Sequence, residues 1–393
     1  MKNLFFGLIL IASYANAQDP IVQAIIDDVS IDSLIYYSSA ISGEFPIDVD
    51  GNVVTIASRN KNFPGNAIAA DYIEQKFQEF GLTTSVVSFG TTGENVLATQ
   101  LGILYPNQKV VVCGHYDSMP ANGTASPAAD DDGSGTAAVI EAARVLSQYQ
   151  FAYTIIYAAW DEEEYGLVGS NNYATTAENN LDSIVAVINI DAIAWDGDGD
   201  KLARVHTRDI ANSVNLATVA QSMISTYGID LQIEVNNPGA TYSDHASFWN
   251  HDFSAILIIE DFDNDGNPHY HTTSDRVEYF DTTYYGEISK WAFATAATMA
   301  VPLSGNVGVF EQAMEDFVVY PNPANGVLHI GSIGKEPGNV NIELLDVAGK
   351  QVLNLNEILP ATIDVSQLPF GNYFLKLSAE DGAVCFTHKV VKK

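Results

Sequence analysis

Residues 110–169 constrain the fold more than any other part of this 393-residue chain, because two apolar runs in this stretch each end in metal-binding side chains. Residues 110–112 are three consecutive valines, and residues 153–159 form the second run. Such runs are typical of strands that are covered on both faces of a sheet. The side chains that follow them are His115 and Asp117 after the first run and Glu162, Glu163 and Glu164 after the second. Because ligands in open α/β sheets bind beyond the carboxyl ends of the strands, we predict a binding site here.

A third acidic cluster, Asp130, Asp131 and Asp132, lies between the two runs and directly before a predicted helix. We expect this helix to extend from Ser134 to about Gln148, because its apolar residues follow the i, i+3, i+4, i+7 spacing. Three carboxylate-rich segments at one sheet edge would repel one another unless a cation lay between them. A divalent metal ion is the simplest such cation.

Strands and helices alternate through the rest of the first 300 residues. We predict helices over residues 66–80 and 286–300, whereas residues 18–60 look helical at first and then irregular. The further predicted strands are residues 83–89, 95–101, 184–190, 203–206 and 254–260. This alternation predicts an α/β fold with a mostly parallel, twisted sheet sandwiched by helices.

The pattern changes from about residue 306. Short runs with strand character, separated by Gly, Pro and Asn, then follow at residues 317–320, 327–330, 341–346, 371–377 and 384–391. They predict a small all-β sandwich domain over residues 317–393. The chain is also too long for one ordinary core. We therefore expect a first domain over residues 18–305 and a linker over residues 306–316.

The first 17 residues have the features of a secretory signal peptide. Lys2 is followed by a short apolar core at residues 4–12 and by Ala-Asn-Ala at residues 15–17. This core is too short to span a bilayer, and no later segment is long and apolar enough either. We therefore expect export from the cytoplasm, without a membrane-spanning segment.

The formal net charge of −32 argues against partners such as nucleic acid or an anionic membrane surface. The two cysteines, Cys113 and Cys385, fall in separate predicted domains, so we expect no disulfide between them. We expect the protein to be a monomer.

Six short motifs carry a resemblance to a known family. In chain order they are H-Y-D, A-D-D-D-G-S-G, E-E-Y-G-L-V-G-S, N-I-D, Y-S-D-H-A-S-F and H-Y-H-T-T-S-D. Over residues 20–305 the set resembles the two-zinc aminopeptidases of the bacterial leucyl aminopeptidase type, in the zinc exopeptidase superfamily, whose fold is phosphorylase/hydrolase-like. The resemblance implies two Zn²⁺ ions per chain that are bridged by Asp131. It further implies that His115 and Asp191 hold one ion and that Glu164 and His271 hold the other.

The chemistry of these residues agrees with that implication. Two imidazoles and three carboxylates around two metals leave open positions for water and substrate, as a catalytic zinc site requires. Two adjacent metals can share one hydroxide and stabilise a developing negative charge. The chain contains no H-E-x-x-H motif, which excludes the commonest pattern of single-zinc proteases.

Three further residues receive predicted roles. Glu163 is the predicted general base, which takes a proton from the metal-bridging water and passes it to the leaving amine. Glu162 is an alternative base, but the Gly166-Leu-x-Gly-Ser segment favours Glu163. We predict that Asp117 orients His115 and that Tyr242 donates its hydroxyl to the oxyanion.

Other histidines and acidic loops receive structural interpretations. His269 competes with His271 as a ligand, but only His271 fits the family pattern. We interpret His245 as a structural residue near a helix start. Residues 196–200 and 263–267 resemble calcium-binding loops only in part, because the glutamate expected at the twelfth position is missing. We interpret both loops as solvated turns.

A second resemblance covers the end of the chain. Tyr320-Pro-Asn-Pro-Ala-Asn, residues 346–350 and the segment from Gly371 to the final lysines resemble the C-terminal sorting domain of type IX (Por) secretion substrates. The resemblance implies that the type IX secretion machinery is a partner. It also implies transport across the outer membrane to the medium or to the cell surface.

Several functions fit these features. The leading hypothesis is an aminopeptidase that acts on peptides with a free N-terminus. A single-zinc glutaminyl cyclase-like acyltransferase shares the fold superfamily, but the presence of both His115 and Asp191 for a second metal argues against it. A carboxypeptidase stays open, because the ligands fix the metals and not the contacts to the substrate. A non-catalytic binding module is disfavoured by the complete ligand set and Glu163.

Overall fold

The computed structural model describes residues 18–303, 317–320, 324–332, 339–346, 350–379 and 384–393. It divides into two compact units, residues 1–303 and residues 304–393. The predicted signal peptide, the predicted linker and the side chain of Cys385 lie outside the described residues. Cys113 is a buried free thiol. Within the described ranges, no helix combines the length and the hydropathy that crossing a bilayer requires.

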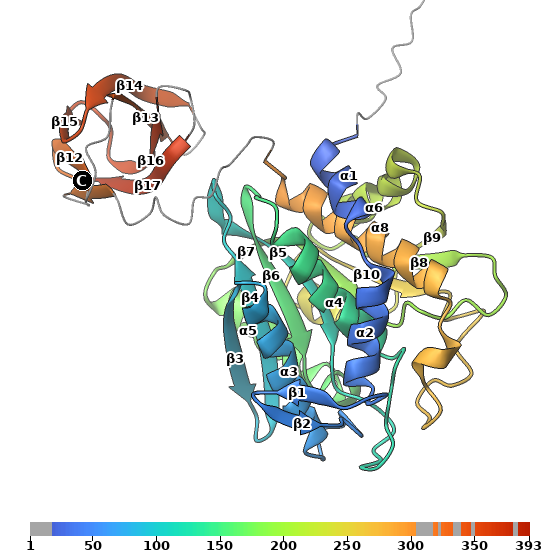
Figure 1. Ribbon diagram of the computed structural model, residues 1–393. Coiled ribbons are helices and arrows are strands. Elements are labelled where there is room, and N and C mark those ends of the chain that lie inside the picture. The colour runs from blue at the N-terminus through green and yellow to red at the C-terminus, as the bar shows by residue number, and fades with distance from the viewer. Residues whose placement is uncertain (1–17, 304–316, 321–323, 333–338, 347–349, 380–383) are drawn as a thin grey trace, which may run out of the picture. The chain divides into compact units, whose positions relative to one another are not determined.

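The first unit is built on an eight-stranded sheet with the order β3-β4-β6-β5-β7-β10-β8-β9 (Figure 1). The strands are β3 (Thr83–Phe89), β4 (Gly93–Gln100), β5 (Tyr105–His115), β6 (Tyr153–Trp160), β7 (Ser183–Ile190), β8 (Leu202–His206), β9 (Gln232–Asn236) and β10 (Ala255–Glu260). The four central strands β6, β5, β7 and β10 are parallel. Antiparallel pairs flank them, β3 with β4 and β4 with β6 on one side and β8 with β10 on the other. The sheet is therefore mixed, and the predicted parallel arrangement holds for its centre.

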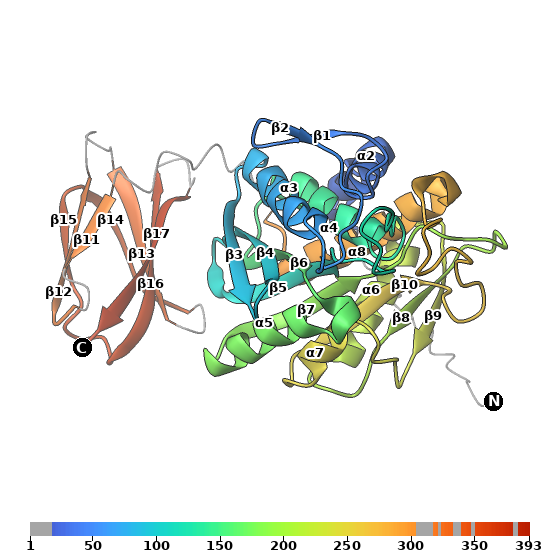
Figure 2. The same cartoon turned by 90° about the horizontal axis from the view of Figure 1, so that it is seen from below.

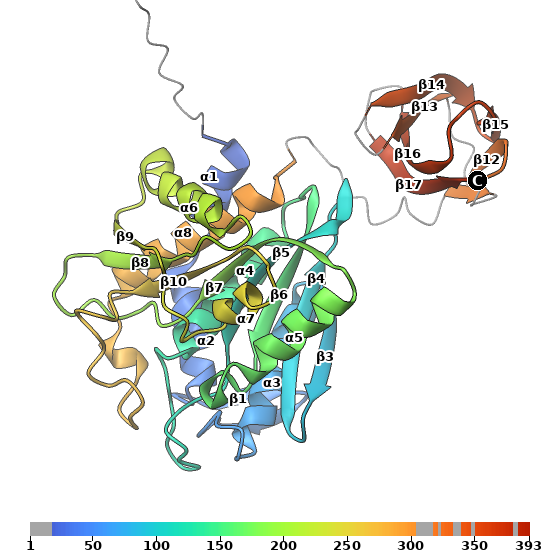
Figure 3. The same cartoon turned by 180° about the vertical axis from the view of Figure 1, so that it is seen from behind.

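Helices cover both faces of this sheet (Figures 2 and 3). One face carries α3 (Gly65–Glu79), α4 (Gly133–Leu146), α6 (Ser213–Tyr227) and α8 (Thr282–Ala300), with α1 (Pro20–Asp27) and α2 (Ile31–Ile41) packed against α8 and α4. The other face carries α5 (Val168–Asn179) and α7 (His245–Trp249). The remaining short elements are β1 (Ile47–Val49), β2 (Asn52–Val54) and the 3₁₀ turns η1 (Glu163–Tyr165) and η2 (Val277–Tyr279).

The apolar run in strand β5 is continuous because helices cover both of its faces. Val110 and Val112 belong to the core beneath α4 and α8, whereas Val111 and Cys113 belong to the core beneath α5 and α7. Successive side chains of a strand point to opposite faces, so a strand with helices on both faces needs apolar residues at every position. All four side chains are fully buried.

The second unit consists of two antiparallel sheets, as the sequence predicts. Their strand orders are β11-β12-β15 and β14-β13-β16-β17. The strands are β11 (Phe317–Tyr320), β12 (Val327–Ser332), β13 (Asn339–Asp346), β14 (Gln351–Ile358), β15 (Ala361–Asp364), β16 (Gly371–Ala379) and β17 (Val384–Lys392). Leu328, Ile342 and Leu375 are fully buried in a core of this unit's own residues. Sequence analysis missed β14 and β15.

Candidate metal centre

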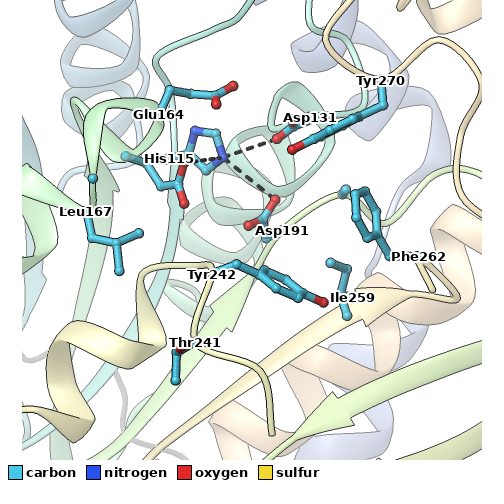
Figure 4. Close-up of a pocket in the computed structure, with 13 residues that line it drawn as sticks. His115, Asp131, Glu164, Leu167, Asp191, Thr241, Tyr242, Ile259, Phe262 and Tyr270 are labelled. Atoms are coloured by element: carbon cyan, nitrogen blue, oxygen red, sulfur yellow. Dashed lines mark ion pairs between the residues drawn. The ribbon is translucent and has the colours of Figure 1, made fainter.

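The segments that follow parallel strands β5, β6, β7 and β10 bring the five predicted ligands together. Four of them, His115, Asp131, Glu164 and Asp191, line one pocket (Figure 4), and His271 contacts Asp131 and Glu164 beside it. His115 is the last residue of β5, and Asp191 directly follows β7. Glu164 lies in the turn after β6, and Asp131 lies just before α4. His271 comes from the loop that follows β10, with a left-handed backbone conformation at φ +54°. Side chains that are far apart in the sequence therefore meet at one sheet edge.

The five side chains form two groups that share Asp131. His115 Nε2 lies 3.3 Å from Asp131 Oδ1 and 3.7 Å from Asp191 Oδ1. His271 Nε2 lies 3.0 Å from Asp131 Oδ2 and 3.0 Å from Glu164 Oε2. Asp131 thus presents one carboxylate oxygen to each group, as a bridging ligand would.

Unsatisfied polar atoms support a metal at this position. Among the described residues, His271 Nε2 and Glu164 Oε1 are buried and have no hydrogen-bond partner of acceptable geometry. Such atoms are rare in folded proteins and call for a specific cause. Imidazole nitrogens and carboxylate oxygens that converge on one point are a donor set that zinc accepts. The residues present therefore fit divalent cations.

Asp132 is also close to His115 and Asp191, but its carboxylate is already engaged. It accepts the backbone N–H groups of His115 at 3.0 Å, Gly135 at 2.8 Å and Ala192 at 3.2 Å. The first and third of these flank the metal pocket, and the second caps α4. Asp132 therefore connects β5, α4 and the end of β7 by hydrogen bonds. Of the two neighbouring aspartates, Asp131 is the one whose carboxylate is available as a metal ligand.

Asp117 lies where the predicted orienting role places it. Its Oδ1 is 3.3 Å from His115 Nδ1. The two oxygens of this carboxylate also accept the backbone N–H groups of Glu163 and Glu164 at 3.0 and 3.3 Å. Asp117 therefore links the first imidazole to the loop that carries the predicted base. Ser243, which sequence analysis did not single out, donates a hydrogen bond of 2.5 Å to Asp191 Oδ2.

Glu163 and Glu162 face different environments. Glu163 lines the pocket, with Oε2 3.8 Å from His115 Nε2, and burial raises the pKa of its carboxyl group well above the usual range. Glu162 has a left-handed backbone conformation at φ +60°, and its side chain accepts from Lys61 at 3.0 Å and from Thr92 at 3.1 Å. The geometry favours Glu163 as the base.

The competing His269 and the predicted structural residue His245 make other contacts. His269 Nδ1 is 2.9 Å from Ser274 Oγ, and its ring stacks on Tyr279. His245 is the first residue of α7, and its Nε2 donates to the carbonyl of Ala240 at 2.9 Å. The acidic loops predicted to be solvated turns bring Asp196, Asp198 and Asp265 together, and their interpretation stays a prediction.

Two tyrosines line the pocket, and their hydroxyl groups point in different directions (Figure 4). The Tyr242 hydroxyl lies 3.5 Å from His206 Nε2. Tyr270 stacks on the imidazole of His271 with ring centroids 3.8 Å apart, and its hydroxyl points toward the ligand cluster. Burial and the carboxylates of Asp131 and Glu164 raise the pKa of Tyr270 above the usual range. Sequence analysis missed Tyr270, although its place directly before His271 was an available signal.

The pocket that these ligands line has a volume of about 470 Å³. Its remaining wall is mainly apolar and aromatic and consists of Gly166, Leu167, Ala192, Thr241, Tyr242, Ile259, Phe262 and Tyr270. No lysine or arginine is among the described residues that line it. The cavity can therefore accept an apolar group next to a strongly acidic centre.

Comparisons with known families fit both units. The family model of peptidase family M28 matches residues 95–296, just over half of the 393-residue chain. The family model of the secretion system C-terminal sorting domain matches residues 318–393.

Two curated relatives have informative names. A probable leucine aminopeptidase from Trichophyton verrucosum is 31% identical over 218 residues, which cover 52% of this chain and 58% of that protein. A probable zinc metalloprotease from Pyrenophora teres f. teres is 33% identical over 159 residues, which cover 35% of this chain and 33% of that protein. The chain thus spans between a third and three fifths of the length of these relatives.

Solved structures show the same fold. The Legionella pneumophila LapA aminopeptidase matches with a TM-score of 0.63 and 22% identity, over 77% of this chain and 78% of that chain. A Bacteroides thetaiotaomicron glutaminyl cyclase bound to N-acetylhistamine matches with a TM-score of 0.55 and 17% identity, over 68% and 97%. Both confirm the α/β architecture. At these identities the likeness does not distinguish a peptidase from a cyclase.

Proposed function

The chain belongs to peptidase family M28, and from this premise we propose that it is a secreted, zinc-dependent aminopeptidase. The observation that carries the proposal is the pair of ligand groups that share Asp131. His115 and Asp191 would hold one zinc ion, and Glu164 and His271 would hold a second. Bound there, the ions would polarise the scissile carbonyl group and acidify the attacking water.

Glu163 is the proposed general base. It lies in the pocket, 3.8 Å from the same His115 nitrogen that faces Asp131, so it borders the space where water and substrate would meet. It would accept a proton from the attacking water and deliver it to the amine that leaves. Asp117 would hold both His115 and the backbone of this loop in place.

Tyr270 is the proposed oxyanion donor, in preference to the predicted Tyr242. A donor in this role must point to the place where negative charge develops, next to the metals. The Tyr270 hydroxyl points to the ligand cluster, whereas the Tyr242 hydroxyl lies beside His206. We assign Tyr242 to the wall of the cavity instead.

The charge of the pocket supports an aminopeptidase over a carboxypeptidase. Asp131, Glu163, Glu164 and Asp191 surround its centre, and none of the described lining residues is a lysine or an arginine. A free N-terminal ammonium group would be attracted there, whereas a C-terminal carboxylate would find no cationic side chain to pair with. The apolar wall would receive the side chain of the N-terminal residue.

The glutaminyl cyclase alternative rests on the shared fold alone. A single-zinc cyclase would need only one group of ligands. The group in which His115 and Asp191 accompany Asp131 would then have no metal to bind. The sorting-domain match at residues 318–393 supports export through a type IX system, and the released or surface-attached location stays open within this proposal.

One assay series tests the proposal. The purified protein is given an amino-acid anilide with a free amine, the same compound N-acetylated, and a peptide with N-terminal glutamine, each with and without chelator. We expect release of aniline from the free amine only, with loss of activity on chelation and recovery with zinc. Elemental analysis should give two zinc ions per chain. Cyclisation of the glutamine peptide with one zinc ion per chain would support the cyclase instead.

A further inference from the structure

Arg59 is the most deeply buried cation among the described residues, with no exposed surface. It precedes α3 and lies outside the segment that matches the peptidase family. Its guanidinium group donates to four backbone carbonyls: Nε to Tyr116 at 2.7 Å, Nη1 to Ile41 at 2.9 Å and Pro127 at 2.7 Å, and Nη2 to Ala128 at 2.8 Å. Its own N–H donates to Ser118 Oγ at 3.0 Å.

Three of the four carbonyl acceptors belong to the two loops that carry metal ligands, and the fourth, Ile41, is the last residue of α2. Tyr116 stands between His115 and Asp117. Residues 127 and 128 precede Asp131 by four and three positions, and Ala128 has the left-handed conformation at φ +44°. One side chain therefore fixes the backbone on both sides of the ligand pair formed by His115 and Asp131, whose facing atoms are 3.3 Å apart.

The neighbours of Arg59 extend this contact to the third ligand loop. Asn60 Nδ2 donates to the carbonyl of Ser118 at 2.9 Å and to the Tyr165 hydroxyl at 3.0 Å. Lys61 pairs with Glu162 at 3.0 Å, and its ammonium group lies 4.2 Å from the centroid of the Tyr165 ring. Residues 59–61 therefore contact the loops that carry His115, Asp131 and Glu164.

Arg59 contacts no carboxylate oxygen within ion-pair distance in the described part of the chain. Burial lowers its pKa to about 10, so the group stays charged at neutral pH, and the carboxylates of Asp275, Asp132 and Asp117 favour the charge from a greater distance. Because its guanidinium group binds only carbonyls, Arg59 does not occupy the carboxylate of any proposed metal ligand. It also offsets part of the repulsion among these carboxylates before any metal is bound.

We propose that Arg59 is a positioning residue of the metal centre. Arg59 holds the loops of His115 and Asp131 in ligating geometry before metal binds, and so raises the affinity of the protein for zinc. The inference rests on the proposed two-metal site. Arginine suits this role because its planar group offers five donors in a fixed arrangement, whereas a lysine offers a single rotatable ammonium group.

The test compares zinc affinity with the stability of the metal-free protein. Arg59→Lys and Arg59→Met are made in the full chain, stripped of metal, and titrated with Zn²⁺ against a chromophoric chelator. Supporting residues around metal ligands typically change metal affinity by about 10–100-fold. We expect a loss of this size in both variants, with the wild-type chain binding two equivalents tightly. Circular dichroism and thermal melting of each metal-free protein establish that it is folded.

Arg144→Met is the matched control. Arg144 pairs with the buried Glu141 and donates to the carbonyl of Asp28, far from the ligand loops. This variant should lower the Tm of the metal-free protein but change zinc affinity by no more than about twofold. Wild-type zinc affinity in folded Arg59→Lys and Arg59→Met would overturn the inference. Loss of folding in both would overturn it too, since Arg59 would then serve the fold as a whole. A wild-type chain that binds no zinc would instead refute the proposed function.

Discussion

At the scale of single residues, we predict that Glu163 acts as the general base and that its neighbour Glu162 does not. Glu163→Gln keeps the shape of the side chain but removes its ability to accept a proton. We expect both metals to stay bound, because Glu163 is not among the five proposed ligands. The turnover number kcat should fall by about 10²–10⁴-fold, the usual contribution of a general base. Elemental analysis and steady-state kinetics on the same preparation measure both quantities.

Glu162→Gln provides the matched control, since the same chemical change is made one residue away. The Glu162 carboxylate pairs with Lys61 and accepts from Thr92 instead of lining the catalytic pocket. Its loss should change kcat by less than tenfold, because a partly exposed ion pair contributes about 0–1 kcal/mol. If the two variants lost activity equally, the assignment of the base would be wrong.

The two tyrosines allow a second comparison of the same kind. Tyr270→Phe removes the hydroxyl that points to the ligand cluster, and loss of one oxyanion donor typically costs about 10²–10³-fold in kcat. Tyr242→Phe removes the hydroxyl beside His206 and should leave kcat within about tenfold of wild type, while KM is free to change. The reverse order of the two losses would restore Tyr242 as the donor. Both variants are measured with one anilide substrate.

At this scale, a functional residue could be predicted from the sequence only when it belonged to a recognisable motif. Sequence motifs singled out His115, Asp131, Glu164, Asp191 and His271, and the structure brings these side chains together. Arg59 gave no such signal, because its acceptors are backbone carbonyls that any residue could supply. Sequence analysis chose Tyr242 as the oxyanion donor and missed Tyr270, because the direction of each hydroxyl group is set by the fold.

At the scale of elements, helix α8 shows how a local cap sets a boundary. The helix was predicted from residue 286 but begins at Thr282, because Asp281 accepts the backbone N–H groups of Thr283 and Tyr284 at 3.0 and 2.9 Å. Asp281→Ala should lower the free energy of unfolding by about 0.5–2 kcal/mol, the typical value of such a cap. Urea denaturation measures this change.

Asp281→Ala should change the stability of the protein without changing its catalytic constants. Asp281 lies outside the pocket, so kcat and KM should match the wild type at temperatures where both proteins are folded. Asp281→Asn is the conservative control, because an asparagine side chain also caps helices well, and it should retain most of the lost stability. A change in kcat in Asp281→Ala would indicate that α8 contributes to the site.

Most elements with strong apolar periodicity were predicted, but helix α6 was missed although it buries Leu216, Ala220 and Met223 at helical spacing. Strand β5 is apolar at consecutive positions because helices cover both faces, and β6, β7 and β10 share this environment. Helix α5 was missed, since its sequence from Val168 to Asn179 is rich in Asn and Thr and buries few residues. Strand β9 is an edge strand with no buried position, so no hydrophobic pattern marks it. The antiparallel pairs at the sheet edges depend on tertiary contacts that no local pattern records.

At the scale of the whole molecule, the two units have separate hydrophobic cores. The clusters around the central sheet contain residues between Val22 and Ala300, and the cluster of the second unit contains residues between Ala324 and Val390. The predicted family and the sorting domain are confirmed by matches to different parts of the chain, residues 95–296 and 318–393. Since every proposed ligand and Glu163 belong to the first unit, catalysis should not require the second.

Removal of residues 317–393 tests this separation in the exporting cell. The truncated protein should be folded, bind zinc and hydrolyse a free-amine anilide with kcat within about twofold of the full chain, since the two units have separate cores and changes at independent sites are additive. It should remain behind the outer membrane, because the segment similar to the sorting domain is missing. Immunoblots of medium, surface and periplasmic fractions locate it. The reciprocal fusion of residues 304–393 to an exported reporter should carry that reporter out. Truncated enzyme in the medium would refute the sorting role, whereas inactive but folded truncated enzyme would show that the second unit supports the site.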